Sequence, residues 1–94
     1  MGSELLLDGR SMASEADLHD VIDRAAREVG FGGYGRNLDA LWDVLTGFLE
    51  LPVQVRWVNA RFNHAWGLRY DKIVRIFEDA ERELGTEFKF EIMP

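Results

Sequence analysis

The chain has 94 residues, no cysteine and a formal net charge of −6 at pH 7, and 47% of its residues are hydrophobic. These values predict one globular domain over residues 1–94, and they exclude disulfide bonds and thiolate metal sites. The acidic balance disfavours binding to nucleic acid, where Lys and Arg supply most of the affinity, and it favours a basic protein partner.

The start of the chain does not have the pattern of a secretory leader. No basic segment precedes the apolar run Leu5–Leu7, and that run is too short for a signal peptide. No apolar stretch approaches the ~20 residues that a membrane-spanning helix needs. We therefore expect a cytoplasmic protein without membrane contact.

The first expected elements are a strand and a helix. Leu5–Leu7 predicts a short buried strand, which the following Asp-Gly pair ends. Ser14, with Asp17 three residues later, is a weaker form of the capping box and predicts the start of a helix. Gly30 predicts the end of this helix, after apolar residues at helical spacing: Leu18, Val21, Ile22, Ala25 and Val29.

A glycine-rich loop, residues 31–35, leads into a second helix. The glycines either make the turn or leave bare backbone that a partner can approach, and Gly35 permits an unusual backbone angle. Asn37 is a good N-cap, because its side-chain oxygen can accept from a free backbone N–H of the first turn. The predicted helix, Leu38–Phe48, places five apolar residues on its core side: Leu38, Leu41, Val44, Leu45 and Phe48.

The other side of this second helix is acidic. Asp39 and Asp43 lie one turn apart on it, together with Thr46. Trp42 borders these residues, and Gly47 lies beyond them. The face is either an ordinary solvated surface or a binding face for positive charge, and aromatic side chains beside charges are typical of protein interfaces.

The last part of the chain predicts two strands and a helix. Val53–Val58 and Phe88–Ile92 alternate apolar and polar residues, so both are expected to be strands. Arg69–Leu84 has the apolar stripe of a helix. The segment before this helix indicates either a short helix or a structured loop. We expect His64 and Trp66, in that segment, to be packed or surface residues rather than ligands.

This order of elements predicts an α/β fold. Strands that are joined through helices pair in parallel, so we expect a small three-stranded parallel sheet packed with helices. The right-handed crossover rule limits the topology further.

Residues 34–47 have the pattern Tyr-Gly-x-Asn-Leu-Asp-Ala-Leu-Trp-Asp-x-Leu-Thr-Gly. This pattern resembles the barstar family of small intracellular inhibitors of guanyl-specific microbial ribonucleases. Looser similarity runs through nearly the whole chain, including Asp17-Leu18-His19 and Trp57. The resemblance implies the family fold and an inhibitor rather than an enzyme, with no cofactor and no metal. It also implies a cis bond between Leu51 and Pro52.

The resemblance implies a ribonuclease-binding face built from the loop and the acidic helix. Such an inhibitor places a carboxylate where the RNA phosphate lies in the nuclease. Asp43 is expected to take that role, and Asp39 to pair with a second basic group. The partner would be a secreted microbial ribonuclease, bound 1:1 through its basic active-site cleft. The expected contact residues are Tyr34, Gly35, Asn37, Leu38, Asp39, Trp42, Asp43, Thr46, Gly47 and Asp79.

Three positions depart from the family pattern. Gly33 stands where a second aromatic residue is usual, and Arg36 stands where an acidic residue is common. Asp79 replaces a Glu that meets a basic residue of the nuclease, and its side chain is one methylene shorter. Each departure removes or changes an expected contact, so the resemblance does not identify the target.

Two other classes of function stay open. Asp39, Asp43, Asp79 and Glu83 offer carboxylates for acid–base or metal chemistry, but no nucleophile, phosphate-binding motif or suitably spaced His accompanies them. A barstar-like module can also bind a basic toxin that is not a ribonuclease, because a fold does not fix its partner.

Overall fold

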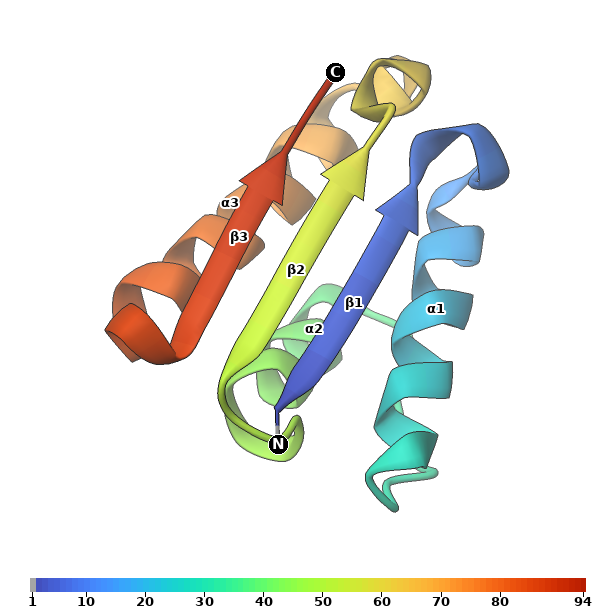
Figure 1. Cartoon of the computed structure of the whole chain (residues 1–94). Helices are drawn as coiled ribbons and strands as arrows, with labels where there is room; N and C mark the ends of the chain where they lie inside the picture. Colours follow the sequence, from blue (N-terminus) through green and yellow to red (C-terminus); the bar gives the residue numbers. More distant parts are fainter. Residues whose placement is uncertain (1) are drawn as a thin grey trace.

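A computed structural model describes residues 2–94 and shows a sheet with helices on one of its faces (Figure 1). The strands pair in parallel in the order β1-β2-β3, with bounds β1 (Ser3–Asp8), β2 (Val53–Val58) and β3 (Phe88–Ile92). The α-helices are α1 (Glu15–Glu28), α2 (Leu38–Asp43) and α3 (Leu68–Leu84). Shorter helical segments are η1 (Gly9–Ser11), η2 (Val44–Phe48), η3 (Ala60–Trp66) and η4 (Gly85–Glu87). The prediction of a small three-stranded parallel sheet packed with helices is confirmed.

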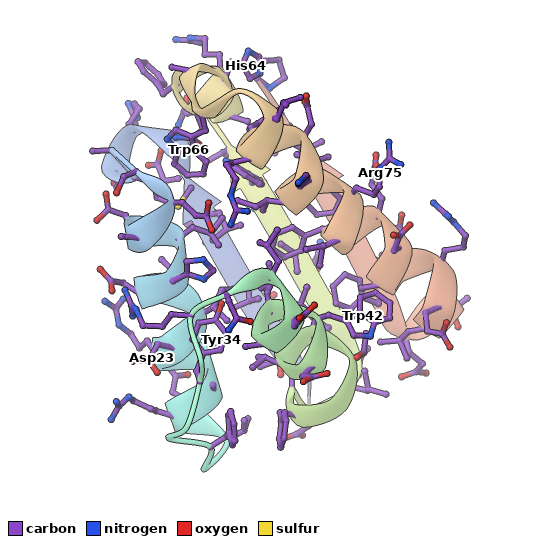
Figure 2. The ribbon with its side chains drawn as sticks, turned by 180° about the vertical axis from the view of Figure 1, so that it is seen from behind. Asp23, Tyr34, Trp42, His64, Trp66 and Arg75 are labelled. Atoms are coloured by element: carbon purple, nitrogen blue, oxygen red, sulfur yellow. The ribbon has the colours of Figure 1, made fainter. Side chains whose placement is uncertain are left out.

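One face of the sheet packs against the helices, and the other is open. Figures 1 and 2 show α1, α2 and α3 on the same side. The buried strand residues alternate and form one layer of the core: Leu5, Leu7, Val53, Val55, Trp57 and Phe88. The prediction that Leu5–Leu7 is wholly buried is wrong for Leu6, which is 60% exposed. A continuous apolar strand is expected where helices cover both faces of a parallel sheet, and here they cover one.

Helix α1 begins and ends at the predicted signals. The Asp17 carboxylate accepts from the backbone N–H groups of Ala13 and Ser14, at 2.7 and 3.2 Å, so it satisfies two donors ahead of the helix. After the helix, Gly30 has a φ of +89°, a conformation that glycine adopts without strain. Three α1 side chains complete the core beneath β1: Leu18, Ile22 and Ala26.

The predicted second helix changes its winding at residue 44. Helix α2 covers Leu38–Asp43, and η2 is a π-helical turn in which the N–H of Leu49 donates to the carbonyl of Val44 at 3.1 Å. This wider turn shifts the helical phase. As a result Leu49 is buried, at 7% exposure, while Phe48 is 45% exposed. The prediction of Phe48 as a core residue is therefore wrong.

Asn63 connects η3 to β2 and to the η1 segment that follows β1. Its side-chain oxygen accepts from the indole N–H of Trp57 at 2.8 Å, and its amide donates to the carbonyls of Gly9 and Met12 at 3.2 and 2.9 Å. Asn63 is fully buried, so these bonds satisfy polar groups that water cannot reach and that would otherwise have no hydrogen-bond partner. They fix the segment that sequence reasoning left open, which forms a short 3₁₀ helix.

The other features of the second half follow the predictions. Helix α3 starts one residue before the predicted position. His64 packs edge-on against Tyr70, and Trp66 is half-buried against the core, as expected of packed or surface residues. The Leu51–Pro52 peptide bond is cis, as the resemblance implied. No helix within residues 2–94 is long and apolar enough to span a membrane.

Candidate protein-binding face

Helix α2 presents two exposed carboxylates one turn apart. Asn37 caps it as predicted, with its side-chain oxygen accepting from the backbone N–H of Ala40 at 2.7 Å. Leu41 anchors the opposite side of the helix in the core. Asp39 and Asp43 are exposed, and within residues 2–94 neither has an ion-pair or hydrogen-bond partner. The helix therefore holds two carboxylates available to a cation from outside.

Trp42 lies between α2 and α3 (Figure 2). It is half-buried and lines an open hollow of about 330 Å³ with Asp79, Arg82 and Glu83. The fold thus brings Asp79 next to the acidic helix, as the predicted site requires. The carboxylate of Asp79 is already paired, because an Arg82 nitrogen lies 3.2 Å from it. Arg82 was missed by sequence reasoning, although its i,i+3 spacing from Asp79 is a signal for such a pair.

The C-terminal end of the face combines open backbone with aromatic rings. Thr46 donates its hydroxyl hydrogen to the carbonyl of Trp42 at 2.7 Å, so only its lone pairs remain for a partner. A side chain built at Gly47 would meet no atom within 4 Å, so this backbone is open to close approach. Phe48 stacks on Phe31, with ring centroids 4.2 Å apart. This partly exposed ring pair was not predicted, because the predicted α-helical phase placed Phe48 in the core.

Tyr34 does not face outward. It is 7% exposed, and its hydroxyl is hydrogen-bonded to Nδ1 of the buried His19. Burial also raises the pKa of the Tyr34 phenol. Figure 2 places the ring between α1 and α2, so Tyr34 supports the loop from inside. Leu38 is only partly buried and stays available at the edge of the face.

Arg36 has the unusual backbone angle that the sequence assigned to Gly35. Its φ is +57°, in the left-handed region. A side chain at Gly35 would lie 3.3 Å from the Asn37 amide nitrogen and 3.4 Å from the Ala40 methyl, so glycine makes room for the start of the helix. The guanidinium of Arg36 turns back onto α1, where it lies 2.6 Å from the Asp20 carboxylate. Its charge is therefore compensated and does not point freely toward a partner.

The four carboxylates considered for metal chemistry do not form a metal site. Asp39 and Asp43 share a helix, whereas Asp79 and Glu83 belong to α3. Within residues 2–94 no group of three His, Cys, Asp or Glu side chains has the geometry to hold a metal ion. The arrangement instead combines free negative charge, a half-buried indole and open backbone, which are features of a surface for a cationic protein.

Comparisons with known proteins show the family to which the chain belongs. The family model described as "Barstar (barnase inhibitor)" matches residues 3–93. The protein "Putative ribonuclease inhibitor YrdF" of Bacillus subtilis (strain 168) is 36% identical over 87 residues, which cover 92% of this chain and 93% of that protein. Together with the fold, these similarities show that the chain belongs to the barstar family.

Proposed function

We propose that this chain inhibits a guanyl-specific microbial ribonuclease by covering its active site with α2 and the loop before it. The observation that carries this proposal is the pair Asp39 and Asp43, which are exposed on a capped helix and have no partner among the residues that the structure describes. The family description as an inhibitor of barnase, and the relative named as a ribonuclease inhibitor, support the same class of partner. In this role the chain acts by binding and not as an enzyme.

Asp43 takes the central role in the proposed contact. An RNA-cleaving site holds phosphate with cationic side chains, and a carboxylate placed there satisfies the same cations. Asp39 meets a second basic group at the rim. Trp42 and the partly buried Leu38 exclude water from both pairs, which makes the loss of either charge more costly. Gly47 lets the two backbones approach.

The remaining predicted contact residues act in two ways. Three of them hold the helix in place: Tyr34 is buried, Gly35 packs closely against the start of the helix, and Asn37 is its N-cap. Thr46 and Asp79 lie at the border of the face. Asp79 contributes less than the α2 carboxylates, because Arg82 already offsets its charge.

The partner proposed is a secreted ribonuclease with a basic cleft, bound 1:1 by a cytoplasmic inhibitor that contacts neither nucleic acid nor membrane. The net charge of −6 supports this choice, because the field of an acidic protein speeds its encounter with a basic one. The rival partner is a basic toxin that is not a ribonuclease. The departures at Gly33 and Asp79 favour the rival, since both weaken contacts expected with the familiar nuclease.

Asp43→Ala tests the proposal, with barnase as the probe and RNA cleavage as the assay. We expect wild type to abolish cleavage stoichiometrically at nanomolar concentration. We expect Asp43→Ala to weaken binding by about 3 kcal/mol or more, more than a hundredfold, a figure typical of charge pairs measured in protein complexes, the barnase–barstar pair among them. Glu4→Ala is the matched control, because Glu4 lies exposed on the open face of the sheet.

Three outcomes separate the hypotheses. A loss under about 1 kcal/mol for Asp43→Ala would refute its central role. Failure of folded wild type to inhibit several guanyl-specific ribonucleases would transfer the proposal to the toxin partner. An equal loss for Glu4→Ala and Asp43→Ala would show that net charge, and not the α2 face, determines binding.

A further inference from the structure

We infer that Arg36, Asp20 and His19 are positioning residues that hold the loop before α2 in one place on α1. We call this set, with Tyr34, the α1 anchor. The inference rests on the proposed function, because its consequence is the affinity of the α2 face for its partner. It assigns to Arg36 a role inside the protein, although Arg36 lies beside the acidic face where a direct contact would be the simplest assumption.

The first half of the anchor is the contact of Arg36 with α1. One guanidinium nitrogen lies 2.6 Å from a carboxylate oxygen of Asp20 and 3.2 Å from the carbonyl oxygen of Ala16. Arg36 holds a left-handed backbone angle while making these contacts, a conformation that is unfavourable for a residue with a side chain. A residue outside the favoured region persists where its surroundings fix it, and here the two bonds to α1 do so.

The second half of the anchor is the contact of Tyr34 with His19. The buried His19 joins Tyr34 through Nδ1 and Glu15 through Nε2, the latter at 2.8 Å. Glu15 in turn accepts two hydrogen bonds of 2.8 Å from Arg69, in the first turn of α3. The imidazole is thus fixed from both sides. Tyr34 is therefore held in one orientation by groups from α1 and α3.

The position of α2 depends on this loop. Helix α2 has six residues, too few to be stable on its own. Its N-cap, Asn37, directly follows Arg36, so a movement at Arg36 moves the cap and the first turn with Asp39. A face that is already ordered loses less conformational entropy on binding. The α1 anchor therefore raises affinity without touching the partner.

A double-mutant cycle tests the inference. The variants are Arg36→Ala, Asp20→Ala and the double variant, each measured for inhibition of barnase. Because this ion pair is partly exposed and screened by solvent, its loss has a modest effect, and we expect each single variant to weaken inhibition about three- to tenfold. The double variant should be no weaker than either single one. Asp23→Ala is the matched control, since Asp23 pairs at 3.1 Å with Arg27 on α1 itself.

A second measurement does not depend on the partner. Amide hydrogen exchange of residues 35–41 in the free proteins should be faster in Arg36→Ala and Asp20→Ala than in wild type and Asp23→Ala. A role limited to global stability would speed exchange throughout the core by a similar factor. Tyr34→Phe, which removes only the hydroxyl, should reproduce the local effect.

Each result decides between the alternatives. Additive losses in the cycle, or a loss for Arg36→Ala alone, would show direct contact with the nuclease and overturn the inference. Unchanged exchange in residues 35–41 would overturn it as well. If wild type fails to inhibit ribonucleases, the proposed function is wrong. Faster exchange in residues 35–41 of the variants would then still support the α1 anchor, which would position α2 for another partner. Unchanged exchange would refute the anchor as well as the proposed function.

Discussion

The ion pair between Glu15 and Arg69 makes the stability of this protein depend on pH in a predictable way. The two hydrogen bonds from Arg69 are the main cause that lowers the pKa of Glu15 from 4.5 to about 2; the bond from His19 adds to them and burial opposes them. Because the folded pKa lies below the unfolded one, the stabilisation is complete above about pH 5 and is lost as the pH falls toward 2.

The size of the effect follows from that difference. A shift from 4.5 to about 2 corresponds to at most about 3 kcal/mol, at 1.36 kcal/mol for each pKa unit. The side chain of Glu15 is 23% exposed, but that of Arg69 is 50% exposed, so solvent screening reduces the value. We expect about 1–2 kcal/mol at pH 7, and linkage predicts that less than half of it remains at pH 3.

Glu15→Gln isolates this contribution, because it removes the charge and keeps the shape. Thermal unfolding should show the variant about 5–10 °C less stable than wild type at pH 7, and the gap should narrow steadily below pH 5. Taking the difference between the two proteins cancels the titration of the other carboxylates. A gap that stays constant from pH 7 to pH 3 would refute the argument, since it would show that charge is not the source of the stabilisation.

Three further predictions follow from named contacts. A methyl group at Gly9 would lie 2.0 Å from the carbonyl oxygen of Asn59, so Gly9→Ala should lower the free energy of unfolding, measured by urea denaturation, by more than about 2 kcal/mol. Gly32 lies in open space, so the control Gly32→Ala should change this free energy by less than about 0.5 kcal/mol. Asn63→Asp replaces the two buried N–H donors of the amide by a carboxylate that faces two carbonyl oxygens. It should lower the free energy of unfolding by about 3 kcal/mol or more at pH 7, and by less in acid. An equal loss of stability at pH 7 and pH 4 would contradict this. Arg82→Ala frees Asp79 and should tighten inhibition of barnase about two- to fivefold, unlike Arg75→Ala; unchanged inhibition would show that Asp79 makes no contact.

The sequence was sufficient where the signal is local. The Asn37 cap, the stop at Gly30 and the alternation in Val53–Val58 each depend on residues within one turn or one strand, and the structure has all three. The parallel sheet followed from the order of these elements, because helical connections leave few ways to pair the strands.

The errors arose where a distant contact overrides a local pattern. Phe48 was placed by counting 3.6 residues per turn, but η2 is wound more widely and buries Leu49 instead. Leu6 was predicted to be buried because it lies in an apolar run, but whether helices cover one or both faces of the sheet is a property of the whole fold. The pairing of Arg36 with Asp20 joins residues 16 positions apart on different elements, and no local pattern indicates it.

The distribution of acidic residues explains how this small fold can be stable and still present negative charge that has no partner among the described residues. On α1, Glu15, Asp20 and Asp23 each pair with a cation, and the pairs of Glu15 and Asp20 join α1 to other segments of the chain. On α2, Asp39 and Asp43 have no ion-pair or hydrogen-bond partner within residues 2–94, and two like charges one turn apart do not stabilise a helix by their mutual interaction. The Asn37 cap and the α1 anchor hold α2 in place, so its two exposed carboxylates are not needed for stability. Removing either carboxylate should therefore leave the unfolding temperature nearly unchanged, whereas removing Glu15 should lower it.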